Sequence, residues 1–262
     1  YVKIDNATEN VIVSPPQLTS PEIKAAGKSI DVKLIDSLKA NTTYTIDFSD
    51  AISDNNEGNP LGNFTYSFST GVEIDTMEVS GYVLAADNLE PVKGILVGLY
   101  SNQADSAFQK TPMLRVSRTD SRGHFIIKGV KKGSYRVYAL QDVDGNYMFS
   151  QKSEKIAFLH DLITTSLKPD VKQDTLWTDS LHIADIKRHD YTHFLPDDVT
   201  LSAFTELQTD RYLLSVTRKE ANHFVTNFSY GNNELPKIKG LNFNEKNAFI
   251  AIPNVKRDTI SY

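Results

Sequence analysis

The chain has 262 residues, which is enough for two or three domains of ordinary size. Its 28 basic and 33 acidic side chains leave a net charge of -5, so it lacks the basic excess that marks a nucleic-acid-binding protein. No apolar run approaches the roughly 18 residues that span a bilayer. The absence of cysteine excludes disulfides, thiolate metal sites and a cysteine nucleophile.

The dominant hydrophobic period is two residues, which predicts antiparallel strands of a β-sandwich. Short alternating runs rich in Tyr, Phe, Val, Ile and Thr occupy residues 11–13, 29–35, 44–48, 64–68 and 135–140. Only residues 20–26 and 152–162 suggest a turn or two of helix. We therefore expect an all-β protein of tandem β-sandwich domains.

Three segments follow one another along the chain, at residues 1–73, 74–160 and 161–262. The second opens on a fresh alternating strand after Thr76, and the third opens on a polar passage. Further strands are predicted in the third segment at 199–206, 212–217, 223–230 and 247–252. We expect the first domain to be incomplete on its N-terminal side and the third on its C-terminal side, as in a piece of a longer protein.

The first segment resembles a bacterial Ig-like domain of the surface-layer type. The resemblance rests on the runs 38–48, 51–59 and 64–71, in which two strands flank a wide polar turn. It implies a Greek-key β-sandwich over residues 1–73.

The second segment resembles the prealbumin-like sandwich of carboxypeptidase regulatory-like domains. The resemblance rests on the runs 79–83, 94–100 and 119–139. Within the last run, Asp120 and Gly123 are expected to form a hairpin turn, with Phe125 and Ile127 facing the core. The return strand is expected to place Tyr135, Val137 and Ala139 on the same face.

An Ig-like module followed by a prealbumin-like module resembles a group of Bacteroidetes cell-envelope proteins, which are often lipid-anchored. The resemblance implies an exported protein of the cell envelope, in the periplasm or at the outer-membrane surface, with a lipid anchor upstream of this chain. It also implies a non-catalytic scaffold and leaves the ligand open.

Asp142, Asp144, Asn146 and Glu154 are the candidate metal ligands. Alternating carboxylate and amide oxygens in a tight loop suit calcium, which prefers hard oxygen ligands. The spacing is not that of an EF-hand, because Tyr147 stands where that loop needs glycine. The alternative is a polar hairpin turn, for which Asp, Gly and Asn are favoured on backbone grounds alone.

Two further groups suggest other chemistry. Trp177 is the only tryptophan, and an exposed indole can stack on a sugar face. The aromatic residues that could join it are Tyr147, Phe149, Tyr191 and Phe194. The second group could bind zinc, and it comprises His182, Asp185, His189, Asp190 and His193.

The leading prediction is a non-catalytic cell-envelope structural or binding module that presents a surface to an envelope protein or a glycan. A carbohydrate-binding accessory protein that uses Trp177 is the first alternative. A metal-dependent hydrolase that uses residues 182–193 is the second.

Overall fold

The computed structural model describes residues 1–49, 51–62, 64–179 and 181–262. The chain divides into two compact units, Tyr1–Glu206 and Leu207–Tyr262, and each is described by itself. Strands make up 47% of the chain and helices 3%, so the predicted all-β class is confirmed.

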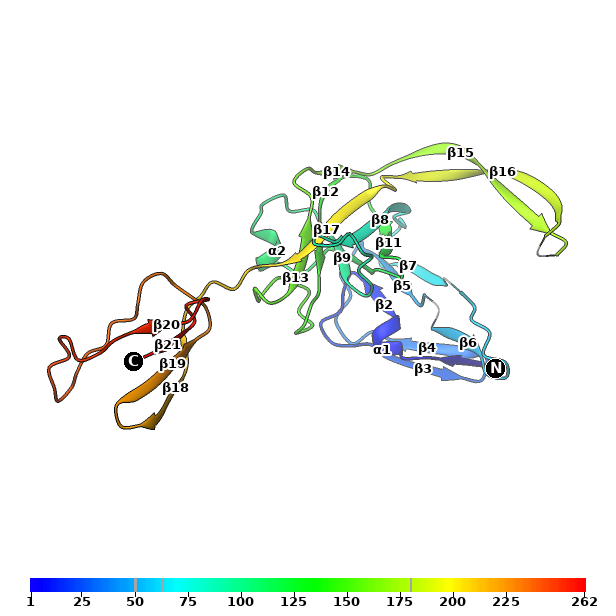
Figure 1. Ribbon diagram of the computed structural model, residues 1–262. Coiled ribbons are helices and arrows are strands. Elements are labelled where there is room, and N and C mark those ends of the chain that lie inside the picture. Colours follow the sequence, from blue (N-terminus) through cyan, green and yellow to red (C-terminus); the bar gives the residue numbers. More distant parts are fainter. Residues whose placement is uncertain (50, 63, 180) are drawn as a thin grey trace. The chain divides into compact units, whose positions relative to one another are not determined.

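The N-terminal part of the first unit packs three small sheets around one core (Figure 1). Its elements are β1 (Val2–Ile4), α1 (Ala7–Asn10), β2 (Ile12–Ser14), β3 (Glu22–Ala26), β4 (Ser29–Lys33), β5 (Thr43–Asp47), β6 (Ile52–Asp54) and β7 (Thr65–Ser69). β5 lies between β2 and β7, β1 pairs with β6, and β3 pairs with β4. Tyr44, Ile46 and Phe48 are buried in the core. The helical turn expected over 20–26 is wrong, because this segment is β3 in a hairpin with β4.

The rest of the first unit is built on an eight-stranded sheet. Its strands are β8 (Met77–Ala85), β9 (Leu96–Tyr100), β10 (Arg115–Arg118), β11 (His124–Val130), β12 (Ser134–Leu140), β13 (Lys155–Phe158), β14 (Ile163–Thr164) and β17 (Val199–Thr205). The order is β10-β9-β12-β13-β17-β8-β11, with β14 beside β12. The end strands β10 and β11 contact each other, so the sheet curls around a core that includes Val79, Leu99, Phe125 and Leu201.

β17 comes from the segment expected as a third region, yet it lies in the sheet of the second. It runs parallel to β8 and antiparallel to β13. Gly81 makes the close approach possible, because a Cβ there would lie 1.8 Å from the carbonyl oxygen of Val199. Val199, Leu201 and Ala203 are buried and complete the core.

The run 119–139 forms the expected turn but not the expected hairpin. Gly123 donates its backbone N–H to Asp120, and this turn joins β10 to β11. These two strands pair with β9 and β8 instead of with each other. Phe125 and Ile127 still face the core. Residues 155–158 are β13, so the helical turn expected over 152–162 is also wrong.

Three further elements of the first unit lie outside this sheet. β15 (Ser166–Trp177) and β16 (Ile183–Leu195) form a long antiparallel hairpin, called the arm below (Figure 1). A four-residue helix, α2 (Ala107–Lys110), follows β9.

The second unit holds a four-stranded sheet of order β18-β19-β21-β20. Its strands are β18 (Leu213–Glu220), β19 (His223–Phe228), β20 (Ile252–Pro253) and β21 (Thr259–Ser261). The strand predicted over 247–252 is wrong except at Ile252, where the short β20 begins. Ile260 of β21 is fully buried.

A buried arginine joins the N-terminal sheets to the eight-stranded sheet. Arg115 on β10 donates through Nη1 to the carbonyl oxygens of Ser14 and Thr43, which belong to β2 and β5. Its Nη2 lies 3.7 Å from Asp75, and only 6% of the Arg115 side chain is exposed. Ser14 also accepts the backbone N–H of Val116 on its hydroxyl. Residues 1–73 and the eight-stranded sheet therefore share one polar junction.

We expect Arg115→Met to lower the free energy of unfolding by about 3 kcal/mol, because it leaves two buried carbonyls and a carboxylate without their donor. Urea unfolding would measure the change. Arg122→Met is the control, since that side chain is 80% exposed and its removal should cost less than about 0.5 kcal/mol. Equal losses in the two variants would contradict a structural role for Arg115.

Candidate functional site

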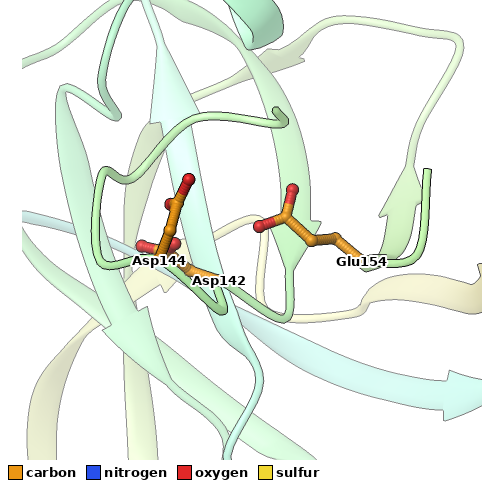
Figure 2. Close-up of side chains that lie close together, drawn as sticks. All are labelled: Asp142, Asp144 and Glu154. Carbon is orange, nitrogen blue, oxygen red and sulfur yellow. The ribbon is translucent and has the colours of Figure 1, made fainter. Parts of the chain in front are cut away.

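Three of the four predicted calcium ligands lie together in the loop between β12 and β13. Asp142, Asp144 and Glu154 each offer a carboxylate oxygen, and these oxygens lie within 4.8 Å of one another. Figure 2 shows Glu154 extending toward the two aspartates from the far side of the loop. The pairing of β12 with β13, extended by the hydrogen bond from Gln141 to Lys155, brings the two ends of the loop together.

The loop's own donors already hold these carboxylates. Glu154 is 0% exposed and accepts backbone N–H groups from Val143 (3.3 Å), Ser150 (3.0 Å) and Gln151 (3.1 Å). Asp142 accepts those of Gly145 (2.9 Å) and Tyr147 (2.8 Å). The same contacts are what a polar turn needs, so the loop can form with or without an ion.

Asp144 and Asn146 complete the turn. The Asp144 carboxylate accepts the hydroxyl of Ser150 at 2.9 Å and the side-chain amide of Asn146 at 2.8 Å. The amide oxygen of Asn146 accepts the backbone N–H of Met148 at 2.6 Å. Asn146 therefore uses both ends of its side chain within the turn. Ser150 was not among the predicted site residues, because nothing in the sequence around this serine distinguishes it as a partner of Asp144.

The two aspartates differ in their electrostatics. Burial raises the pKa of Asp142, against the opposing effect of the N–H donors of Tyr147 and Gly145. Burial acts in the same direction on Asp144, but the Ser150 and Asn146 donors outweigh it and lower the pKa of that carboxyl. A raised carboxyl pKa means that stability falls as pH rises from the unfolded pKa through the folded one. A cation beside ionised Asp142 would offset the free-energy cost of burying its negative charge.

The loop also covers an aromatic cluster on the outer face of the sheet. Phe108 stacks on Tyr138 and on Phe149, with ring centroids 4.3 and 5.5 Å apart. The carbonyl oxygen of Tyr147 accepts the backbone N–H of Met113, and Phe149 donates its own to Phe108. The loop therefore has a packing role that does not depend on an ion.

Calcium binding by this loop stays a prediction, and thermal unfolding tests it. Calcium at one hundred times its dissociation constant should add about 2.7 kcal/mol of stability. Asp144→Asn should remove most of the gain, whereas Asp87→Asn, at an exposed acidic residue in another turn, should keep it. A gain of equal size in Asp144→Asn would show that calcium acts elsewhere.

The arm has two different faces, which its register separates. Partners across an antiparallel ladder share a face, and faces alternate along each strand. One face carries the charged residues Lys168, Asp170, Lys172, Asp174, Lys187, His189 and His193. The other carries most of the large apolar residues, namely Leu167, Val171, Trp177, Ile183, Ile186 and Phe194, and is interrupted by Gln173, Arg188 and Asp190.

The charged face is held by contacts of lysine and histidine side chains with carboxylates at neighbouring positions. Lys172 lies 3.4 Å from Asp174, and His189 lies 3.4 Å from the same carboxylate. His193 lies 2.9 Å from Asp170. The predicted zinc-binding histidines are thus distributed along the arm, each beside its own aspartate. His189 and His193 are four residues apart on an extended strand, or about 13 Å, which is too far for one zinc ion.

The aromatic residues considered with Trp177 do not gather around it. Trp177 is 58% exposed at the end of β15, opposite Ile183. Phe149 is buried in the cluster beneath the 142–154 loop, and Tyr191 lies on the charged face of the arm.

His193 lies between two carboxylates. Its Nδ1 lies 2.9 Å from Asp170 and its Nε2 lies 2.7 Å from Asp197. These two hydrogen bonds, that of Asp170 first, raise the pKa of His193 above its usual 6.5. The stabilisation is complete below the unfolded pKa and is lost as pH rises through the folded one.

We therefore expect a His193 pKa above 6.5 by NMR titration, lowered more by Asp170→Asn than by Asp197→Asn. Amide-exchange protection of Leu167 and Phe194, corrected for intrinsic rates, should fall as pH rises through that pKa. His193→Gln should abolish the pH dependence, and His189→Gln should preserve it. A pKa of 6.5 or below would contradict the two-carboxylate arrangement.

A groove of about 710 Å³ opens in the N-terminal part of the first unit. Its lining is almost entirely apolar and includes Ile30, Val32, Phe64 and Phe68. Lys28 and Tyr66 are the ionisable residues of that lining, which offers no acid and base pair among the described residues. An almost entirely apolar lining suits the binding of an apolar group.

Residues 1–70 match the bacterial Ig-like domain family, which supports the Ig-like resemblance of the first segment. Among solved structures, the T6 backbone pilin of serotype M6 Streptococcus pyogenes aligns with 12% identity and a TM-score of 0.24. That alignment covers 80% of this chain and 57% of the pilin, so the chain spans little more than half of it. No curated protein matches the chain. Within the described residues, no helix is both long and apolar enough to cross a membrane.

Proposed function

We propose that the chain is a non-catalytic module of the bacterial cell surface that uses the arm to bind a protein partner. The observation that carries this proposal is the uncovered apolar face of the arm. Leu167, Val171, Trp177, Ile183 and Ile186 are all between 49% and 58% exposed. A two-stranded ribbon has no second layer of its own to cover such a face. Contiguous exposed apolar side chains of this kind mark interaction surfaces.

The charged face explains how such a ribbon can stay ordered and soluble before it binds. Its ion pairs link neighbouring positions on one side, which favours a single register. Lysines and aspartates along a two-stranded ribbon also discourage pairing of its edges with other strands. A partner is therefore recognised through side chains of the apolar face, with Trp177 and Ile186 near the tip as its anchors.

Three further observations support binding over catalysis. The carboxylates of the 142–154 loop are occupied by the loop's own donors. Each histidine of the arm lies beside a separate carboxylate. The described lining of the groove in the Ig-like part carries no acid and base pair. Placement in the envelope rests on the Ig-like module, and a Bacteroidetes source, a lipid anchor and a prealbumin-like second domain remain proposals.

The carbohydrate-binding alternative rests on Trp177 alone, because the other aromatic residues lie elsewhere. Saturable glycan binding that is lost in Trp177→Ala would favour it. Binding to a protein should instead depend on the whole apolar face.

Site-specific photo-crosslinking in cells that produce the chain tests the proposal. Ile186 and Lys187 are adjacent residues on opposite faces of the arm, so they form a matched pair. With benzoyl-phenylalanine in place of Ile186, irradiation should give one discrete protein adduct. The same replacement of Lys187 should give little of it. Equal adducts from both positions, or none from Ile186, would contradict a docking role for the apolar face.

A further inference from the structure

The second compact unit contains a pocket of about 450 Å³ with a strongly basic lining. Arg211, Lys256 and Arg257 supply three cationic groups, and Thr209, Asn232 and Asn233 add polar ones. No carboxylate is among the described residues that line it. This concentration of positive charge stands out in a chain whose net charge is -5.

Arg211 has donors that its surroundings do not satisfy. Its guanidinium lies over the ring of Phe228, with 4.3 Å from Cζ to the ring centroid. Nη1 donates to the carbonyl oxygen of Glu234 at 2.8 Å. Nε and Nη2 are buried and have no hydrogen-bond partner in the part of the chain that the structure describes. Buried charged donors without an acceptor are costly, and a missing ion is a common reason for them.

The opposite wall of the pocket is a tight turn that carries the other two cations. The side-chain oxygen of Asn254 accepts the backbone N–H groups of Asp258 (3.1 Å) and Thr259 (3.2 Å). Arg257, inside this turn, donates through Nη1 to the carbonyl oxygen of Asn233 at 3.0 Å. Arg211 and Arg257 thus each donate one nitrogen to the 233–234 loop.

Gly231 brings the two walls together. A Cβ at this position would lie 1.8 Å from the carbonyl oxygen of Lys256, so only glycine allows the turns to touch. The nearby carboxylate of Asp258 is engaged by the side chains of Asn254 (2.7 Å) and Thr259 (3.2 Å). It remains an anion outside the lining, and the charge of Lys256 helps to lower its pKa, so it compensates Lys256 in part but does not supply an acceptor to Arg211.

We propose that this pocket binds a tetrahedral oxyanion, the phosphate or sulfate group of a ligand. Guanidinium groups present planar pairs of donors that match two oxygens of such a group at once. An anion in the pocket would face the cationic groups of Arg211, Lys256 and Arg257. With the Arg211 side chain turned toward it, the anion would give Nε and Nη2 the acceptors that they lack. This inference is independent of the arm, which belongs to the first unit.

NMR titration of the full chain with inorganic phosphate and with sulfate tests the proposal, with chloride added to equal ionic strength as the reference. The Arg211 Nε–H resonance is identified by its loss in Arg211→Gln. It should shift saturably with a dissociation constant on the order of 1 mM. Arg257→Gln should weaken binding by about tenfold, as expected for one charge-assisted hydrogen bond. A preference for either anion supports the site and indicates the group it takes.

Lys237→Gln is the matched control, because it removes the same charge from an exposed residue of this unit outside the pocket. It should change the affinity by less than about twofold, since exposed charges are screened beyond about 8 Å. Circular dichroism shows whether each variant is folded, and Arg257→Gln keeps the test usable if Arg211→Gln is not. The proposal is overturned by an Arg211 resonance that does not respond, or by equal weakening in Arg257→Gln and Lys237→Gln.

Discussion

The junction around Arg115 is the constraint on which the first unit depends. Burial lowers the pKa of Arg115, and the charge of Asp75 opposes that effect. A buried guanidinium must keep acceptors for its donors, so the carbonyls of Ser14 and Thr43 are held at fixed positions against β10. The Ig-like part is thereby tied to the eight-stranded sheet as one compact unit, not as a bead on a flexible linker.

Two smaller contacts reinforce this junction. Lys128 on β11 donates to the hydroxyl of Thr65 at 3.0 Å. A Cβ on Gly129 would lie 2.8 Å from a methyl group of Thr45, so the backbone of β11 packs closely against β5. The elements that carry the arm, the loop and the groove therefore belong to one compact unit.

The strands could be predicted from the local hydrophobic pattern. The order in which they pair could not, because it depends on contacts between residues far apart in the sequence. Alternation correctly marked β5, β7 and β12, because each strand shows its period within five to seven residues. The segments 20–26 and 152–162 are short and mixed in composition, so periodicity could not separate a helical turn from a strand. The parallel pairing of β17 with β8 joins positions more than a hundred residues apart. Gly81 was the one residue whose type could have indicated this pairing from the sequence. A lone glycine in a strand, however, can equally mark a bulge or a bend.

The candidate sites likewise include one that local sequence predicts and others that depend on long-range structure. Sequence spacing brought forward Asp142, Asp144 and Glu154, because a hairpin loop returns near its own start. The two faces of the arm need the register between β15 and β16, which no single strand reveals. The unsatisfied donors of Arg211 depend on which atoms the fold covers. Such sites become visible only when the partners of each atom are known.

The anchoring of the arm has a mechanical consequence. β15 begins just after β14, which pairs with β12, and β16 continues through Pro196 into β17, which pairs with β8 and β13. Tension applied at the tip would run along both backbones at once, so covalent bonds would carry it and the ladder would not unzip. The pulling force would reach the eight-stranded sheet as shear between β17 and β8, where several hydrogen bonds must break together. A connection built in this way holds best when it is pulled lengthwise.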